Sequence, residues 1–360
     1  MATKQLKTRQ ICLFFIAFTF INKIFTLPSI IANVSKNDLW ISSFFNVLLD
    51  GFTLILMLIL SKNTDQDFFT MLERLLTKTG AKIISCFYFL YFFSKSVLPI
   101  IEQREYIELT LYIPNPSFLY FLPFFIVCFY IATKKLRILG RLADVLFLSS
   151  ALGFIVLMAL SIPHADFSNT LPIGVNGLSA IIKGSFLSLV WYGDALYFLF
   201  FIGNFKRAKK DGTKISVAYF ISGIIVVLFM VVFYGIFTSI AYRQKFSLTE
   251  ISKYTTIINS TGRFDYFAIL MLLVSNVVTL SIPLYFCAKI LDHIFNVKYK
   301  YLSPAIVSVL SLTLTLVLTE RIFSAQKIII TLFGIFYVLM ANVLPVILLL
   351  ISKRRKHENS

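Results

Sequence analysis

Long apolar stretches separated by short polar segments dominate the chain. About ten of them reach the length, roughly 20 residues, that a helix needs to cross a bilayer. Their approximate limits are 11–34, 40–60, 83–103, 117–133, 142–162, 184–203, 215–240, 265–288, 303–319 and 328–351. No polar segment between them is long enough for a second folded unit. The pattern predicts an all-α polytopic membrane protein with a single transmembrane domain over residues 1–360.

The first apolar stretch contains polar residues that a plain membrane anchor would not carry. Asn22 and Lys23 lie near its centre, and Pro28 follows about one turn later. Lipid cannot satisfy the backbone groups that a proline frees, so such a break persists only against protein or a water-filled cavity. We therefore expect a discontinuous helix over Asn22–Ser29 that lines a small-molecule site.

Ten spans divide into two repeats of five, and an odd-numbered repeat inserts with inverted topology. Inverted repeats place binding sites at the bilayer midplane, on paired broken helices. The repeats are predicted at about 11–162 and 184–351, so a break in span 1 predicts one in span 6. Span 6 indeed has Gly193 and Asp194 near its middle. Pro99 in span 3 and Pro283 in span 8 also correspond.

Composition supports the membrane class. Apolar residues make up 58% of the chain and charged residues 14%, with a mean hydropathy of +0.84. A net charge of +17 would suggest nucleic acid in a soluble protein, but here the basic residues occupy short loops. Alternate loops hold 23 and 9 lysines and arginines, which places both termini in the cytoplasm. The expected surroundings are a lipid bilayer, with no nucleic-acid partner.

Charged residues inside membrane spans are costly and mark functional sites. Lys23 is a candidate fixed cation that pairs with Asp194 or with a substrate carboxylate; the alternatives are snorkelling to the interface and a purely structural ion pair. Asp194, beside Gly193, is a candidate for binding an ammonium group or relaying a proton. Trp191 and Tyr192 would form an aromatic wall beside it. The alternative for Asp194 is a structural carboxylate that caps a half-helix.

Two further spans carry polar faces. Lys95, Pro99, Glu102 and Tyr106 recur at helical spacing, so they share one face of span 3. That face lines an entry path, or its upper part, Glu102–Glu108, is a solvated helix end.

Span 8 carries Ser275, Asn276 and Thr279, whose oxygen atoms suit a sodium ion. Polar residues that only pack helices together give the same pattern. Asp50 and Asp144 are interpreted as lying near span ends, with Asp144 in an interfacial pair with Arg141.

Several classes of activity lack their sequence signals. The chain has no nucleotide-binding loop of the G-x-x-x-x-G-K-[ST] type and no intramembrane protease motif. His164, His293 and His357 are scattered and adjoin no Cys or Glu cluster, and the four cysteines form no CxxC pair. We expect no enzyme activity, no metal site and no cofactor.

The residues resemble one family, the B subunits of bacterial spore nutrient-germinant receptors, within the amino acid–polyamine–organocation transporter superfamily. Leu27-Pro28 followed by Asp38-Leu39-Trp40-Ile41-Ser42 is similar to that family's opening. Gly262-Arg263-Phe264-Asp265 resembles its "E-R-x-[DE]" step before span 8, with Gly262 where an acid is usual. Asn342–Pro345 and the basic tail Lys353–Lys356 complete the resemblance, which extends over nearly the whole chain in length and layout.

The resemblance implies a LeuT-like fold of ten helices in two inverted repeats, with an amino-acid-sized pocket at the broken helices. It places this pocket at Thr19, Asn22, Phe25, Thr26, Pro99, Trp191, Tyr192, Gly193 and Asp194, beside Lys23 and Pro28 from the break itself. It also implies A-type and C-type partner subunits and the spore inner membrane. Lys23 departs from the family pattern, in which a neutral residue is expected, and a cation there would restrict the ligand class.

Two functions fit these observations. The first is a receptor subunit that binds a small amino-acid-like germinant and signals to its partners. The second is a proton-coupled amino acid transporter, a symporter or exchanger, on the same scaffold. Their pockets would be nearly identical, so the sequence leaves both open.

Overall fold

The structure is a computed structural model that describes residues 6–62, 66–111, 118–205, 208, 210–253, 265–319, 330 and 333–358. Within these ranges the chain is helical, apart from one isolated bridge between Leu6 and Phe205. The helices of the first half are α1 (Thr8–Ile21), α2 (Leu27–Ser35), α3 (Leu39–Ser61), α4 (Phe68–Leu75), α5 (Lys78–Leu111), α6 (Phe118–Ala132) and α7 (Leu136–Ser161). Those of the second half are α8 (Gly177–Ser188), α9 (Asp211–Phe237), α10 (Ser247–Lys253), α11 (Asp265–Phe295), α12 (Leu302–Thr319) and α14 (Leu344–Glu358).

Short tight turns connect or extend these helices. The 3₁₀ segments are η1 (Lys36–Asp38), η2 (Ile162–His164), η3 (Phe167–Thr170), η4 (Leu189–Trp191), η5 (Asp194–Phe201) and η6 (Thr238–Arg243). A π-helical turn, η7 (Leu339–Val343), precedes α14. Two of the 3₁₀ segments, η4 and η5, lie inside the predicted sixth span.

The described helices include five stretches that are long and apolar enough to cross a membrane. They are Leu27–Ser61, Lys78–Gln103, Gly177–Phe201, Asp211–Arg243 and Phe333–Arg355. The protein is therefore an integral membrane protein. The predicted apolar runs coincide with helical segments, but the count of ten spans and the inverted repeat remain predictions.

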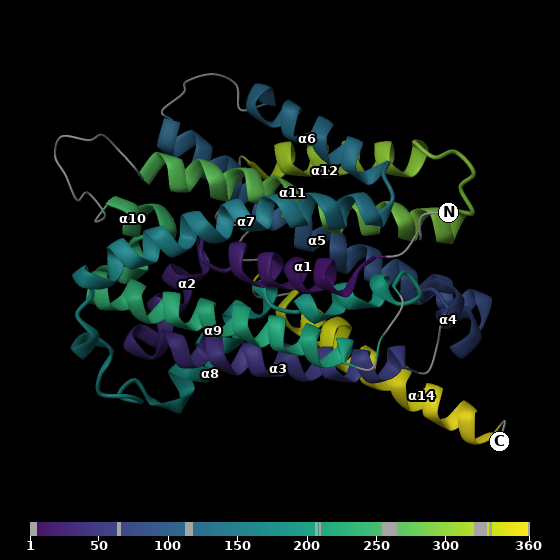
Figure 1. Cartoon of the computed structure of the whole chain (residues 1–360), viewed down its shortest axis with the longest axis horizontal. Helices are drawn as coiled ribbons and strands as arrows, with labels where there is room; N and C mark the ends of the chain where they lie inside the picture. Colours follow the sequence, from purple (N-terminus) through teal and green to yellow (C-terminus); the bar gives the residue numbers. More distant parts are fainter. Residues whose placement is uncertain are drawn as a thin grey trace.

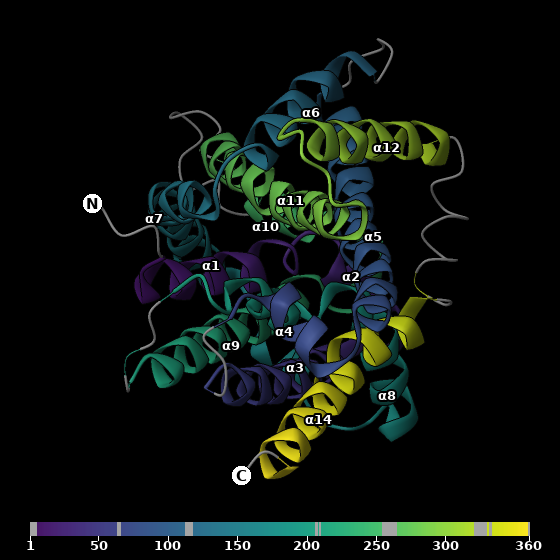
Figure 2. The ribbon, with the colours of Figure 1, turned by 90° about the vertical axis from the view of Figure 1, so that its right-hand side faces the viewer.

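Seen along the bundle, the helices form two groups (Figure 2). On one side α6, α7, α11 and α12 gather with α5, and α11 packs against the other four. On the other side lie α3, α8, α9 and α14, with α1 and α2 between the groups. Residues far apart in sequence thus meet at the middle of the bundle, where α1 and α2 join.

The described chain begins and ends at the same end of the bundle, where α4 also lies (Figure 1). The segment from α7 to α8 and the short helix α10 lie at the opposite end. This arrangement agrees with an even number of crossings. Which end faces the cytoplasm remains a prediction from the charge distribution.

Two segments that the sequence pattern assigned to loops contain helices. In α4, Phe68, Met71, Leu72 and Leu75 are buried at helical spacing, and Asp67 accepts a hydrogen bond from the Thr70 backbone N–H at the helix start. Such an amphipathic helix of eight residues is too short for a span-length search to detect. The second helix is α10, which packs against the break between α1 and α2.

The Asp38–Ser42 segment joins the two halves of the chain. Asp38 accepts a hydrogen bond from the Gly174 N–H (2.8 Å), and the Ser42 hydroxyl donates to the Ile181 carbonyl (3.0 Å). At Gly184 of α8 a Cβ atom would overlap the hydroxyl groups of Ser35 in α2 and of Ser42, so glycine is required for the close approach. The segment therefore binds α8 to α2 and α3.

Candidate functional site

Two interruptions of helix meet inside the bundle. α1 ends at Ile21 and α2 begins at Leu27; η4 ends at Trp191 and η5 begins at Asp194. Both interruptions predicted from the sequence are therefore present. Pro28 lies in the first turn of α2, where its missing N–H breaks no helical hydrogen bond.

Gly193 makes the second interruption possible. Its φ of +88° is a left-handed conformation that residues with a Cβ rarely adopt. Its carbonyl accepts a hydrogen bond from the Tyr91 hydroxyl at 2.9 Å, which fixes the turn against α5. A Cβ atom at this position would overlap the same hydroxyl.

Lys23, Asp50, Lys95 and Asp194, hereafter the charge cluster, lie between the two interruptions. The Lys23 ammonium pairs with the Oδ2 atom of Asp194, and both side chains are almost completely buried. The Lys95 Nζ atom lies 3.4 Å from Asp194 Oδ1 and donates to the Tyr192 carbonyl. Lys23 has no exposed surface, so snorkelling to the interface is excluded. The ion pair between Lys23 and Asp194 is the one considered from the sequence.

Asp50 is the site residue that sequence reasoning missed. It was placed near a span end, but it is the twelfth of the 23 residues of α3 and is buried. Its carboxylate accepts hydrogen bonds from the N–H groups of Asp194 (2.8 Å) and Ala195 (3.1 Å) and from the Tyr219 hydroxyl (2.9 Å). A single carboxylate at the centre of an apolar span is the signal that could have identified it.

The charge cluster matches the helix dipoles at the second interruption. Asp50 lies at the N-terminal end of η5, where unpaired N–H groups favour an anion. Lys95 binds the carbonyl at the C-terminal end of η4, where a cation is favoured. With two lysines and two aspartates in their charged forms, the cluster has no net charge. Each of its four charged groups has an ion-pair or hydrogen-bond partner within the described part of the protein.

Tyrosines surround the charge cluster. The Tyr192 hydroxyl hydrogen-bonds to the Ser43 hydroxyl, and its ring centroid lies 4.8 Å from Lys23 Nζ. On the other side, the ring centroid of Tyr337, a residue that the sequence did not indicate, lies 5.6 Å from Lys95 Nζ. Each lysine therefore contacts an aromatic face as well as oxygen atoms.

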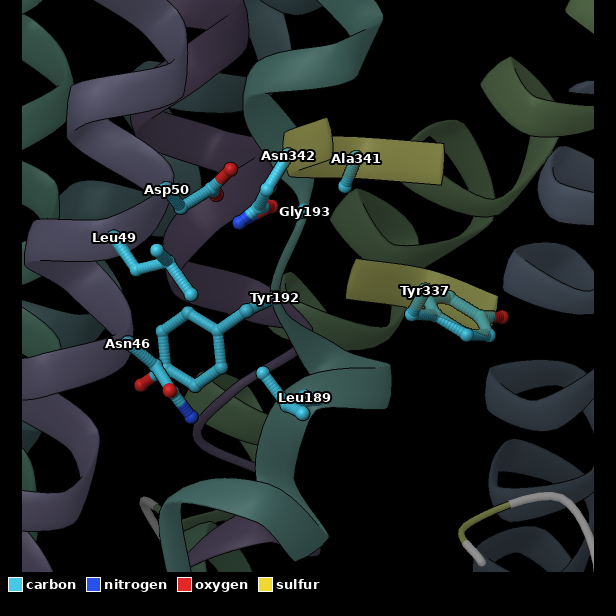
Figure 3. Close-up of a pocket in the computed structure, with 9 residues that line it drawn as sticks. All are labelled: Asn46, Leu49, Asp50, Leu189, Tyr192, Gly193, Tyr337, Ala341 and Asn342. Carbon is cyan, nitrogen blue, oxygen red and sulfur yellow. The ribbon is translucent and has the colours of Figure 1, made fainter. Parts of the chain in front are cut away.

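A pocket opens beside the charge cluster (Figure 3). It encloses about 240 Å³ and is lined by Asn46, Leu49, Asp50, Leu189, Tyr192, Gly193, Tyr337, Ala341 and Asn342. Asn342 extends from the chain near α14 toward Asp50 on α3 (Figure 3). The space inside it that is open to a water-sized molecule is about 10 Å³, which is room for roughly one water molecule, so a larger ligand requires the pocket to widen.

Other predicted residues lie around the first interruption. Thr19 is buried in α1 and Asn22 ends that helix; the Oγ1 atom of Thr19 and the Oδ1 atom of Asn22 have no hydrogen-bond partner among the described residues. Phe25 packs edge-on against Tyr106, with ring centroids 5.0 Å apart. Pro99 lies inside α5 and does not line the pocket shown in Figure 3.

A second polar group, hereafter the Glu102 cluster, comprises Thr26, Glu102, Trp191 and Thr249. Glu102 is only 5% exposed, so it is not a solvated helix end. Its carboxyl group lies beside Thr26 and Trp191. Thr249 belongs to α10, two residues after Ser247, whose N–H donates to the Phe25 carbonyl next to Thr26. Each of the four residues has a buried polar atom without a hydrogen-bond partner among the described residues.

The remaining sequence predictions have mixed outcomes. Thr279 is buried in α11, whereas the side chains of Ser275 and Asn276 lie outside the described part, as does the segment 262–264. The sodium site therefore stays a prediction. Asp144 pairs with Arg9 at 3.3 Å, so its predicted pairing with Arg141 is wrong.

Folding brings one histidine near a carboxylate that is distant in sequence. The Nε2 atom of His293 lies 3.9 Å from the Glu73 Oε1 atom, because α4 brings that carboxylate to the end of α11. Among the described residues no group of three His, Cys, Asp or Glu side chains is arranged to hold a metal ion.

The fold and the paired helix interruptions define a transporter-like membrane protein. The chain is similar to a solved structure described as the substrate-bound, outward-open state of a Na⁺-coupled sialic acid symporter, with a TM-score of 0.66 and 10% identity. The match covers 92% of this chain and 77% of the symporter. At this identity the likeness shows the fold alone.

The family follows from the sequence. A family model described as spore germination protein matches residues 5–323, and the chain belongs to that family. No curated protein has a sequence that matches significantly. The family and the transporter fold together point to a membrane protein that is not an enzyme.

Proposed function

We propose that the chain is the B subunit of a spore nutrient-germinant receptor, which binds a small amino-acid-like germinant between its two helix interruptions. The observation that carries the proposal is the charge cluster. A spore germination protein with a transporter fold has its two interruptions held face to face by a buried ion pair, Lys23–Asp194.

This arrangement is suited to sensing. The Lys23–Asp194 pair connects the chain between α1 and α2 with the start of η5, so a ligand inserted beside it changes how the two halves pack. Signalling requires only that the ligand bind one arrangement more tightly than the other. The narrow pocket beside Tyr192 and Gly193 fits a closed arrangement that has to open for a larger ligand.

The proposal includes the finer architecture. It comprises ten helices in two inverted five-helix repeats, cytoplasmic termini, the spore inner membrane, and A-type and C-type subunits as partners. Supporting the repeat, the group around α11 contains predicted spans 3, 4, 8 and 9, which correspond in pairs between the repeats.

The second candidate is a proton-coupled amino acid transporter. The likeness to a Na⁺-coupled symporter favours it, because the same scaffold can expose a midplane site to either side in turn. Buried carboxylates at an interruption would also suit proton binding.

One experiment on the full chain in liposomes separates the candidates. With L-alanine, L-leucine and L-valine as radiolabelled probes, the receptor proposal expects saturable binding without accumulation inside the vesicles. Accumulation driven by a proton gradient would support the transporter and contradict a sensor that does not transport.

A parallel test uses spores that carry the receptor with its partner subunits. Asp194→Asn removes the charge that pairs with Lys23, so the germination response should be lost while the protein still inserts in the membrane. Asp166→Asn, in the exposed segment between α7 and α8, is the matched control and should respond normally. A normal response from Asp194→Asn would remove the charge cluster from the signalling mechanism.

A further inference from the structure

Glu102 differs from the other carboxylates buried near the helix interruptions. Asp50 and Asp194 each interact with at least one cation or backbone N–H group. Glu102 is equally buried, but its Oε1 atom has no hydrogen-bond partner among the described residues. A buried charged group without a partner is strongly disfavoured, so it indicates a binding partner that the protein alone does not supply.

Polar residues near Glu102 also have buried atoms without a hydrogen-bond partner among the described residues. The Thr26 hydroxyl and the Trp191 N–H lie within interaction range of the carboxyl group, but their Oγ1 and Nε1 atoms make no hydrogen bond of regular geometry to the described residues. The Thr249 Oγ1 atom is also buried without a partner there. Each such atom costs about 1–3 kcal/mol, and stable proteins rarely gather four of them in one place without a function.

The position of the Glu102 cluster relates it to the helix interruptions. Thr26 precedes α2 and Trp191 ends η4, so both lie on the segments that also carry Lys23 and Asp194. Glu102 follows Lys95 by seven residues on α5, which places it on the same face about 10 Å further along the helix axis. The Glu102 cluster is therefore a second layer of the same site, displaced toward α10.

This layer is covered from the α10 side. The rings of Phe25, Tyr106 and Phe246 contact one another edge-on, with centroid distances of 5.0 to 5.9 Å. The Ser247 N–H donates to the Phe25 carbonyl at 2.8 Å, and Lys245 pairs with Glu105. The cover shields Glu102 from water, which strengthens any charge–charge interaction made there.

We propose that Glu102 binds the ammonium group of a primary amine, with Thr26 and Trp191 as its immediate neighbours. The carboxylate supplies charge-assisted hydrogen bonds, the Thr26 hydroxyl supplies a further acceptor, and the indole attracts the cation. This inference rests on the proposed function and deepens it. It assigns the amine end of the germinant to Glu102 and leaves Asp194 to the ion pair with Lys23.

The test uses the fluorescence of Trp191 in the purified full chain. The chain has two tryptophans, so a Trp40→Phe background makes Trp191 the single reporter. Isobutylamine and isobutyrate, matched in their hydrocarbon part, are the probes. The amine should change the emission saturably, whereas the acid should not. Equal responses to both probes, or no saturable response to the amine, would overturn the assignment.

Variants locate the response. Glu102→Gln should weaken amine binding at least about tenfold, because a charge-assisted hydrogen bond contributes about 1.5–3 kcal/mol. Glu250→Gln, which changes a half-buried glutamate of α10 that pairs with Lys253, is the matched control and should bind like the parent. Unchanged affinity in Glu102→Gln would contradict the proposal.

A further measurement needs no variant. A hydrophobic carbodiimide modifies buried carboxyl groups, and mass spectrometry locates the modified residue. Isobutylamine should protect Glu102 in the parent chain, and isobutyrate should not; modification of Glu102 that the amine leaves unchanged would contradict the proposal.

The test is independent of the germination assay. Amine binding that requires Glu102, in a chain whose spores ignore all amino acids, would sink the receptor proposal and leave the amine site in place. Conversely, a chain that binds no amine but still supports germination in response to amino acids would overturn the amine site and leave the receptor proposal in place.

Discussion

The charge cluster and the Glu102 cluster share three segments of chain, the two interruptions and α5, but differ in how their charges are satisfied. In the charge cluster, each aspartate meets a lysine or backbone N–H groups, and each lysine meets an oxygen. In the Glu102 cluster, a carboxylate, an indole and two hydroxyl groups each have a polar atom with no partner among the described residues. The charged groups of the charge cluster are therefore paired within the protein, whereas the Glu102 cluster keeps polar atoms that have no partner among the described residues.

This contrast separates structure from recognition. The sequence left Lys23 and Asp194 open as ligand-binding charges or as an ion pair, and in the structure they bind each other. A saturated ion pair holds the two interruptions together and gives up little to a ligand. The nearby Glu102 carboxylate has an oxygen atom without a hydrogen-bond partner among the described residues, so it would gain more from binding a ligand. Four predictions test this division, in decreasing order of expected effect.

The largest effect is expected for Asp50→Asn. The amide loses the negative charge and places a donor group against the N–H groups of Asp194 and Ala195. The loss in unfolding free energy should be about 3–5 kcal/mol, as for a broken buried charge pair. Thermal unfolding in detergent measures it, and Asp166→Asn on the exposed segment is the control. An unchanged melting temperature would mean that the charge cluster does not hold the interruptions together.

Removal of Lys23 should have the next largest effect. Lys23→Met leaves Asp194 with Lys95 alone, so the expected loss is about 1.5–3 kcal/mol. Lys183→Met on the exposed face of α8 serves as the control. The double variant Lys23→Met/Asp194→Ala removes both charges and should lose less than the two single variants together. Strict additivity would show that the two side chains do not interact.

Gly193→Ala isolates the conformation of the second interruption. The substitution costs about 1–2 kcal/mol for the left-handed backbone and adds an overlap with the Tyr91 hydroxyl. Gly174→Ala has a similar φ of +80° but meets open space, so it measures the backbone cost alone. Gly193→Ala should melt at a lower temperature than Gly174→Ala; equal melting temperatures would remove Tyr91 from the packing of the interruption.

The smallest effect on stability is expected for Glu102→Gln. Because its Oε1 atom has no partner to lose, removal of the charge should leave the melting temperature unchanged or raise it slightly. The same kind of substitution at Asp50 and at Glu102 should therefore change stability very differently. A loss at Glu102 comparable to that of Asp50→Asn would show that Glu102 is already paired within the protein.

The sequence predicted the helical membrane class and both interruptions, because the signals are local. Pro28 and Gly193 impose backbone geometry wherever they occur, and Lys23 and Asp194 are conspicuous within apolar runs. The predicted spans coincide with helices for the same reason. Among the helices of the described residues, α4 and α10, which are short and lie within polar segments, were missed.

The partners of Asp50 and Lys95 could not be predicted from the sequence. Asp50 meets the start of η5 across 144 residues of sequence, and Lys95 meets Tyr192 across 97. Such contacts depend on how α3 and α5 pack around the second interruption, which no local pattern encodes. The surroundings of Glu102 depend on Thr26 and Trp191, which come from the two interruptions and are distant in sequence.

A structure of the chain with a bound amino acid that triggers germination tests the account most directly. The account predicts ligand density between residues 22–26 and 191–194, with the amino nitrogen within hydrogen-bond distance of Glu102 and the Lys23–Asp194 pair intact. An amino group bound to Asp194 with Lys23 displaced, or a ligand located away from both interruptions, would contradict it.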